Sequence, residues 1–296
     1  MKKFGALLFE PISWLLSIAP HFILYGIADI TFVVLYYMVG YRKQVVYNNI
    51  KNSFPEKSEI EIKEIQRKFF HHLSDTFIET AALIKMSQKR VLRMVKFEDT
   101  NIAKKLYENK KNVIGITGHF SNWELGLTLP KIIPHLVLGV YKPLNNKSFD
   151  KLFYKMREKF GAVPVTMNDS YKKILKYNKE NQLTFFGLVA DQRPPKIGGN
   201  YWTTFLNQET PVFMGPEKIA RKLNAAIVFL YLEKVKRGKY IMKIKLLYED
   251  VSKCEVHEIT ETHLRFLENL IKEKPEYWLW SHKRWKHKRE PDTPIH

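Results

Sequence analysis

Cysteine is almost absent from this sequence of 296 residues, which contains a single one, Cys254. One cysteine excludes an intramolecular disulfide and a zinc site built from several thiolates. The histidines at 71–72 lack a second ligand pair at metal spacing, so no metal site is expected. Nucleotide-binding fingerprints are missing too, because the glycine pair at 198–199 lies in an expected loop and no Walker lysine is present.

Acidic residues are also scarce, with 30 Asp and Glu against 49 Lys and Arg, which gives a net charge of +19. Such an excess of positive charge suits an anionic membrane surface, a nucleic acid or an acidic ligand. At the same time 45% of the residues are hydrophobic and 14% are aromatic. The chain can therefore bury a substantial core, in one large domain or two small ones.

An apolar stretch at 22–40, FILYGIADITFVVLYYMVG, carries Asp29 as its one charge. Its length is close to the roughly 20 residues that a helix needs to span a bilayer. Arg42 and Lys43 follow at once, which predicts that this end lies in the cytoplasm. No small-residue cleavage site follows cleanly, so a removed signal peptide is not expected. A helical hairpin that lies in the membrane interface, or that packs on the rest of the protein, is the alternative.

Residues 44–96 are expected to be mainly helical, with a turn at 52–55, and strand and helix patterns alternate after residue 112. Strands are expected at 112–117, 136–141, 163–166, 183–189, 226–232 and 240–248, and helices at 121–129, 147–160, 170–178, 215–223 and 262–272. Alternation of this kind predicts an α/β fold, an αβα sandwich around a mostly parallel sheet. We therefore divide the chain into an N-terminal membrane-associated helical segment, 1–43, and an α/β domain, 44–296.

The window at 114–124, IGITGHFSNWE, places a Gly-His pair after the first of these strands, and Glu124 follows His119 by five positions. The carboxyl end of a strand is where open α/β sheets bind ligands. A carboxylate in the first turn of the next helix could hold one imidazole nitrogen, which would leave the other to take a proton. This arrangement is a serine triad without its nucleophile, so the hydroxyl would belong to the substrate. The window therefore predicts transfer to an alcohol.

A structural role for the same residues is also open. Ser121 and Glu124 have the spacing of a capping box, in which the glutamate satisfies free backbone N–H groups at the start of a helix. Both roles can coexist, because each needs only one carboxylate oxygen.

Four more polar residues are candidates for substrate or oxyanion binding. Lys142 follows the strand at 136–141 and could face a phosphate or an acyl-carrier group, or simply lie in solvent. The guanidinium of Arg157 suits an oxyanion or a phosphate, with an ion pair to a neighbour as the alternative. Asp191 would share a sheet edge with His119 and could pair with Arg157, orient the site or serve only a turn. Asn122, inside the window, is a further candidate.

The segment at 275–289, PEYWLWSHKRWKHKR, interleaves aromatic and basic side chains. Nucleic-acid binding by stacking and phosphate contacts has this pattern, and so does an anchor in the headgroup region of a membrane. Beside an apolar N-terminal segment the second is favoured. We therefore expect an anionic membrane surface as partner, no nucleic acid, and lipid contacts from Trp278, Trp280, Arg284 and Trp285.

These blocks, in this order, resemble the lipid A biosynthesis acyltransferase family, the late lauroyl and myristoyl acyltransferases of lipopolysaccharide assembly. The resemblance covers nearly the whole chain. The His-x4-Glu pattern alone is similar to the wider glycerolipid acyltransferase superfamily. The Asp-Gln pair at 191–192 and the PEYWLWSHKR block narrow the resemblance to the lipid A branch.

The resemblance implies transfer of a fatty acyl chain from acyl carrier protein, or from coenzyme A, to a hydroxyl of a lipid A precursor. It implies a place on the cytoplasmic face of the cell inner membrane and no cofactor. The family's catalytic dyad falls on His119 and Glu124, and its basic and acidic site residues fall on Arg157 and Asp191. Lys142 stands where the family often has arginine.

Departures from the family pattern leave the acceptor open. Another membrane lipid, such as a lysophospholipid, an amino-acid lipid or a glycolipid, is the alternative within the family. A non-catalytic basic protein that binds membranes or nucleic acid is the alternative from another class.

Overall fold

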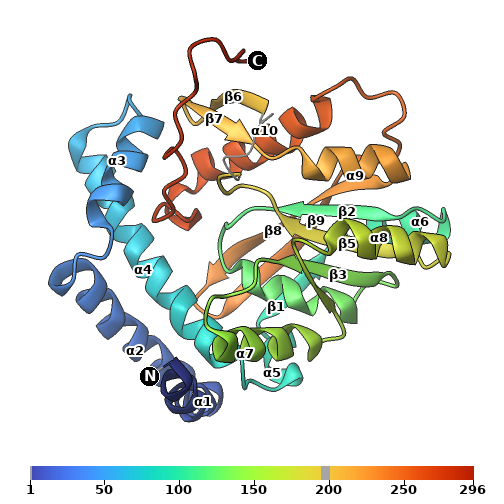
Figure 1. Ribbon diagram of the computed structural model, residues 1–296. Coiled ribbons are helices and arrows are strands. Elements are labelled where there is room, and N and C mark those ends of the chain that lie inside the picture. Colours follow the sequence, from blue (N-terminus) through green and yellow to red (C-terminus); the bar gives the residue numbers. More distant parts are fainter. Residues whose placement is uncertain (1, 195–200) are drawn as a thin grey trace.

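The computed structural model describes residues 2–194 and 201–296. The glycine pair at 198–199, expected in a loop, falls outside this described part of the chain. A seven-stranded sheet with the order β1-β9-β8-β2-β5-β3-β4 forms the centre of the molecule (Figure 1). Its neighbouring strands are parallel except for the antiparallel pair β8 and β9. The predicted α/β class with a mostly parallel sheet is confirmed.

The strands of this sheet are β1 (Val95–Glu98), β2 (Val113–Thr117), β3 (Leu136–Tyr141), β4 (Val163–Thr166), β5 (Thr184–Val189), β8 (Ala226–Lys236) and β9 (Lys239–Tyr248). A separate antiparallel pair consists of β6 (Tyr201–Phe205) and β7 (Gln208–Val212). Strands β1, β6 and β7 were not among those expected from the sequence. All three are short, and polar residues interrupt their apolar patterns.

The helical elements are α1 (Lys2–Ile18), α2 (His21–Val33), η1 (Val34–Met38), α3 (Lys43–Ser53), α4 (Glu59–Leu83), α5 (Gln88–Leu92), α6 (Asn101–Glu108), η2 (Trp123–Lys131), α7 (Lys147–Glu158), α8 (Ser170–Lys179), α9 (Gly215–Leu223), α10 (Glu258–Glu273) and η3 (Pro275–Tyr277). Side chains alternate between the two faces of a strand, and β2 shows the result. Val113 joins a core with residues of α4 to α7, whereas Ile114 joins one with residues of α8 to α10. Helices therefore cover both faces of the sheet, as predicted.

The position of the Phe185 ring in the core requires Gly115 in β2. A Cβ atom at this position would lie 2.1 Å from Cε1 of Phe185 in the neighbouring strand β5. The ring of Phe185 therefore occupies the space that any larger residue at position 115 would need. The Phe185 ring thus packs over Gly115 on one face of the sheet, and the candidate site lies at the carboxyl ends of these two strands.

The N-terminal helices α1 and α2 both pack against α4, and α2 runs alongside it (Figure 1). Residues His21–Met38 are long and apolar enough to cross a membrane, and 17% of this stretch is buried. Leu24, Tyr25 and Ala28 of α2 are buried, whereas Phe22 and Ile30 are 77% and 66% exposed. The segment thus packs one face on the protein and leaves the other face apolar and open.

Asp29, the one charge in the apolar stretch, pairs with Arg237 and lies 3.2 Å from Nε2 of His71. The hydrogen bond from Arg237 lowers the pKa of Asp29, so this group stays a carboxylate. The charge therefore has partners on the protein itself. The exposed face of α2 carries large apolar side chains, such as those of Phe22 and Ile30.

Candidate active site

The site begins with the register between two parallel strands. Thr117 of β2 pairs with Val189 of β5, so His119 and Asp191, each two residues further on, reach the same edge of the sheet. The Nδ1 atom of His119 lies 2.7 Å from Oδ1 of Asp191. The backbone N–H of His119 donates to Oδ2 of the same carboxylate over 2.9 Å. The prediction that Asp191 shares the edge with His119 is confirmed.

Gly118 allows this close approach. A Cβ atom at position 118 would lie 2.9 Å from Cδ1 of Leu267 and 3.4 Å from Oδ2 of Asp191. A Cβ here would require the end of the Leu267 side chain to shift. The glycine of the Gly-His pair thus lets α10 and the carboxylate pack directly against this loop.

Asp191 is buried and remains ionised. Burial alone would raise the pKa of its carboxyl, but the charge and hydrogen bonds of His119, together with the indole N–H of Trp278, lower it to about 2. Trp278 donates from Nε1 to Oδ2 over 2.7 Å. A carboxylate that accepts from three N–H groups is well solvated by the protein itself.

The partners of the imidazole define its tautomer. A carboxylate can only accept, so Nδ1 of His119 carries the proton that faces Asp191. The other nitrogen, Nε2, then offers its lone pair and lies 3.0 Å from the amide nitrogen of Gln192. The His119 side chain is 17% exposed, and the ring of Trp123 packs against it at 4.9 Å between centroids. A partly exposed imidazole whose Nε2 lone pair can accept a proton, with a carboxylate behind its other nitrogen, can act as a general base.

Glu124 is paired differently from the expectation. Among the described residues, the carboxylate that holds the ring of His119 is Asp191, and Glu124 Oε1 instead lies 3.6 Å from Nη2 of Arg157. The guanidinium of Arg157 also lies over the ring of Tyr141, 5.1 Å from its centroid. The expected partners are thus exchanged: His119 pairs with Asp191 and Glu124 with Arg157, in place of a His119–Glu124 dyad beside an Asp191 that could pair with Arg157.

Local backbone geometry explains this difference. Ser121 has φ of 57°, a left-handed conformation that costs a non-glycine residue roughly 1–2 kcal/mol. The helix expected at 121–129 cannot begin there, and the observed element is a 3₁₀-helix that starts at Trp123. The hydroxyl of Ser121 has no partner among the described residues, so the expected capping box with Glu124 does not form. Nothing in the sequence indicates a left-handed serine at this position.

Lys142 and Asn122 differ in burial and in the partners of their side chains. Lys142 follows β3 and is exposed, which leaves it available to an anionic ligand. Asn122 is fully buried, and its Nδ2 donates to Oε2 of Glu79 over 2.6 Å. The expectation that Asn122 binds substrate is therefore corrected, because its amide serves the protein interior.

The aromatic and basic segment near the C-terminus forms part of the site. Trp278 pairs with Phe120 as an antiparallel bridge, and the backbone N–H of Leu279 donates to the carbonyl of His119 over 3.1 Å. Trp278, Trp280 and Arg284 are each at most 2% exposed. The expectation of lipid contacts from these three residues is wrong, because they are packed inside the protein.

Trp285 also faces the protein. It is half-buried, and its indole N–H donates to Oγ1 of Thr210 over 2.8 Å. Arg284 donates from Nη2 to the carbonyl of Pro211 over 2.8 Å. Tryptophan and arginine suit a membrane interface and a buried hydrogen-bonded corner equally well, so the sequence pattern could not separate the two.

Three functional contacts went unrecognised in the sequence: the amide of Gln192 on His119, the indole of Trp278 on Asp191, and Glu79 behind Asn122. In the sequence, the feature that could have singled out Glu79 is its position as a carboxylate within the apolar pattern of α4. In residues 2–194 and 201–296 no group of three His, Cys, Asp or Glu could hold a metal ion.

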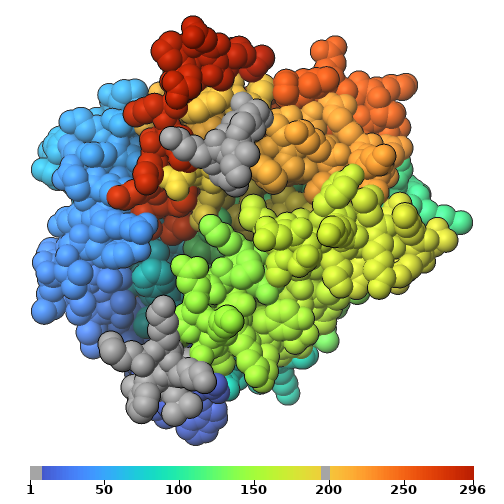
Figure 2. All heavy atoms as spheres, viewed as in Figure 1, coloured from blue at the N-terminus to red at the C-terminus, as the bar shows by residue number. Residues whose placement is uncertain are grey.

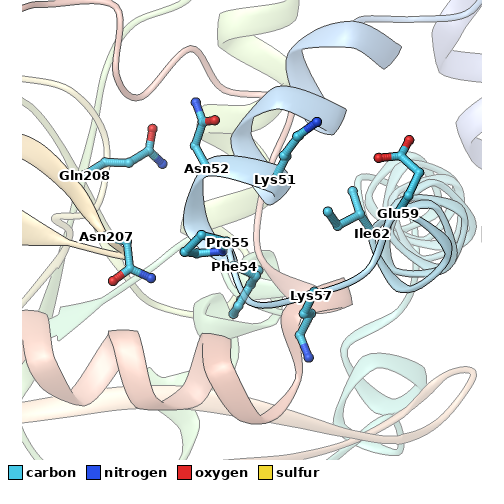
Figure 3. A pocket seen from close by; sticks show the side chains of 9 residues that line it. All are labelled: Lys51, Asn52, Phe54, Pro55, Lys57, Glu59, Ile62, Asn207 and Gln208. Carbon is cyan, nitrogen blue, oxygen red and sulfur yellow. The ribbon is translucent and has the colours of Figure 1, made fainter.

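The surface of the molecule has several hollows (Figure 2). Figure 2 shows a depression near the centre of this face, between the N-terminal helices and the C-terminal segment. Tyr277 lines a cavity of about 290 Å³, and its carbonyl accepts a hydrogen bond from the backbone N–H of Ser121 in the site. A larger cavity of about 670 Å³ lies between the α3–α4 turn and the β6–β7 turn (Figure 3). Its lining includes none of the site residues described above, so it lies apart from His119.

Comparisons with known proteins support the family resemblance seen in the sequence. A family model described as "Bacterial lipid A biosynthesis acyltransferase" matches residues 2–287 of the chain. The chain is also 22% identical, over 98% of its own length and 97% of the relative's, to a "Lipid A biosynthesis lauroyltransferase" from Escherichia coli (strain K12).

Proposed function

Since the chain belongs to the bacterial lipid A biosynthesis acyltransferase family, we propose that it transfers a fatty acyl chain from a thioester donor to a hydroxyl of a lipid A precursor. The donor is acyl carrier protein or coenzyme A carrying the acyl chain. The observation that carries the proposal is the His119–Asp191 pair, which leaves Nε2 of the imidazole able to accept a proton. No nucleophilic side chain is needed, because the acceptor brings the hydroxyl.

The reaction proceeds in one complex of enzyme, donor and acceptor. Nε2 of His119 takes the hydroxyl proton while the acceptor oxygen attacks the thioester carbonyl. The tetrahedral intermediate collapses, the C–S bond breaks, and the thiolate leaves and takes up the proton from the imidazolium. The carboxylate of Asp191 stabilises the imidazolium that forms between these steps. Base catalysis of this kind typically contributes about 10²–10⁴-fold to the rate.

Two neighbours of His119 have supporting roles in this proposal. The Gln192 amide gives way to the acceptor hydroxyl, because both need the lone pair on Nε2. The side chains of the Arg157–Glu124 pair are 22% and 17% exposed, so solvent and ligands can reach them. Arg157 is a cation available for the oxyanion or for a substrate phosphate, and Glu124 holds it in place.

The N-terminal segment places the reaction at a membrane. Support comes from the exposed apolar face of α1 and α2, where Trp14, Phe22 and Ile30 are all more than half exposed. The net charge of +19 suits the anionic cytoplasmic surface of the inner membrane, and also an acidic carrier protein. The lipid acceptor and the site are thereby brought to the same surface.

The test is mass spectrometry of total lipid and lipid A from cells with and without the gene. We expect loss of one ester-linked acyl chain from lipid A when the gene is absent, and its return when the gene is restored. An unchanged lipid A together with a changed phospholipid or amino-acid lipid would move the proposal to another acceptor. A covalent acyl-enzyme trapped on any residue would contradict direct transfer.

A further inference from the structure

Glu79 of α4 is a fully buried carboxylate that does not touch the reacting groups. It accepts three hydrogen bonds, each 2.6 Å long, from three distant parts of the chain. The donors are the hydroxyl of Tyr25 in α2, the hydroxyl of Tyr240 in β9 and the amide of Asn122. A buried carboxylate is costly unless it is fully hydrogen-bonded, so these donors account for its presence in the core. The role of this carboxylate follows from the parts of the chain that it connects.

The contact with Asn122 reaches the candidate active site. Asn122 stands between His119 and Glu124, directly after Ser121 in its left-handed conformation. The backbone of this turn is fixed on one side by the carbonyl of Tyr277, which accepts from the N–H of Ser121. On the other side the side chain of Asn122 is fixed by Glu79, because Oδ1 of Asn122 has no partner among the described residues.

The contact with Tyr25 reaches the apolar N-terminal segment. Tyr25 is buried on the inner face of α2, while Phe22 on the same helix is 77% exposed. Its hydroxyl donates to Oε1 of Glu79, and Asn122 donates to Oε2 of the same carboxylate. One carboxylate therefore joins the helix that presents an apolar face to the turn that carries His119 and Glu124.

We propose that Glu79 is a positioning residue that holds the turn at Ser121 and Asn122 so that His119 and Glu124 keep their places. Through Tyr25, the order of this turn depends on how α2 is seated against α4. Binding of the N-terminal segment to a lipid surface is then linked to the conformation of the turn that carries His119 and Glu124. This inference rests on the proposed acyl transfer for its kinetic test, and on the geometry alone for its spectroscopic test.

The first variant is Glu79→Gln, which places an amide NH₂ among three donors at almost constant volume. We expect kcat to fall about 10- to 100-fold while KM for the thioester donor stays within about twofold, because misplacement of a catalytic group acts on the chemical step. Thermal unfolding, followed in parallel, must show a folded protein. Wild-type kcat in a folded Glu79→Gln protein would overturn the proposal.

The second variant, Glu79→Gln with Asn122→Asp, exchanges donor and acceptor and restores the hydrogen bond. We expect it to recover most of the lost kcat, so the two substitutions are strongly non-additive. A double variant no faster than Glu79→Gln would overturn the positioning role. This comparison remains informative even if Glu79→Gln alone is poorly folded.

The link to α2 is tested with Tyr25→Phe, which removes one hydroxyl. We expect about a 3- to 10-fold lower kcat. Tyr47→Phe is the matched control, because it also removes a 2.6 Å hydrogen bond from a tyrosine to a glutamate, Glu59, but on the exposed surface far from this network. It should keep the wild-type rate. Equal rates in the two variants would overturn the link.

A readout without substrate separates this inference from the proposed function. In protein labelled with ¹⁵N-histidine, the imidazole signals of His119 are identified by their loss in His119→Gln. We expect Glu79→Gln to shift or broaden them and the double variant to restore them, whether or not acyl transfer is detected. Unchanged His119 signals in Glu79→Gln would contradict the inference and leave the proposed function untouched.

Discussion

His119 and Asp191 each stand two residues beyond a pair of parallel, in-register strands, and the carboxylate holds both the ring and the backbone N–H of the histidine. Two contacts from one carboxylate fix the position of the imidazole as well as its tautomer. The orientation of the candidate base therefore follows from the register of the sheet, and it does not depend on Glu124.

Replacement of Asp191 by asparagine tests this relationship. The amide of asparagine can present its NH₂ to Nδ1, which would favour the tautomer with the proton on Nε2 and remove the lone pair needed for catalysis. We expect transfer to slow by about 10²–10⁴-fold in a protein that still folds. Asp292→Asn, an exposed aspartate near the C-terminus, should keep the wild-type rate. A folded Asp191→Asn protein with normal kcat would show that the base is oriented by another group.

Glu124 and Arg157 are expected to act as one unit. Glu124→Gln and Arg157→Gln should each lower kcat/KM, and the double variant should be no slower than the worse single variant, because their 3.6 Å ion pair can be lost only once. Steady-state kinetics of the four proteins measures this coupling. Additive losses would instead support the independent role for Glu124 that the His-x4-Glu spacing suggested.

The indole of Trp278 is expected to support Asp191. Trp278→Phe keeps an aromatic ring in the core but removes one hydrogen bond to the carboxylate, which should cost about 1–3 kcal/mol of unfolding free energy and lower kcat several-fold. Trp285→Phe is the matched comparison, because it removes an indole hydrogen bond to Thr210 without touching Asp191. It should reduce stability and leave kcat unchanged. Equal kinetic effects of the two would argue against this role.

Acid should destabilise the protein in two overlapping ranges of pH. Burial lowers the pKa of His72 to about 3 and of His263 and His282 to about 4. The unfolded chain then binds more protons than the folded one below about pH 6.5, so stability is full above that value and falls toward pH 4. Asp191, with its pKa lowered to about 2, adds a further loss only between about pH 4 and 2.

Urea unfolding between pH 7 and 4.5 measures the upper range. His263→Leu should make the slope shallower by at most about 1.4 kcal/mol per pH unit, the share of one proton. His296→Gln, at the exposed C-terminal residue, should leave the slope unchanged. A wild-type stability independent of pH in this range would contradict the assignment of neutral buried histidines.

Sequence patterns predicted the parallel sheet well, because β2, β5 and β8 are buried on both faces and read as continuous apolar runs. They also predicted that His119 and Asp191 share one edge. They failed for the partner of the imidazole, because that choice depends on strand register and on the left-handed Ser121, which are properties of the folded chain. The prediction of lipid contacts from the aromatic and basic block failed for a related reason. Tryptophan and arginine occur both at lipid surfaces and in buried hydrogen bonds, here from Trp278 to the Asp191 carboxylate and from Arg284 to the Pro211 carbonyl.

The most direct test of the central claim is the rate of acyl transfer by purified His119→Ala, measured with a thioester donor and a lipid acceptor. Without an imidazole at this position the acceptor hydroxyl has no base, so we expect a rate about 10²–10⁴-fold below wild type in a protein that still folds and binds the donor. A folded His119→Ala protein that transfers acyl chains at the wild-type rate would contradict general-base catalysis at this site.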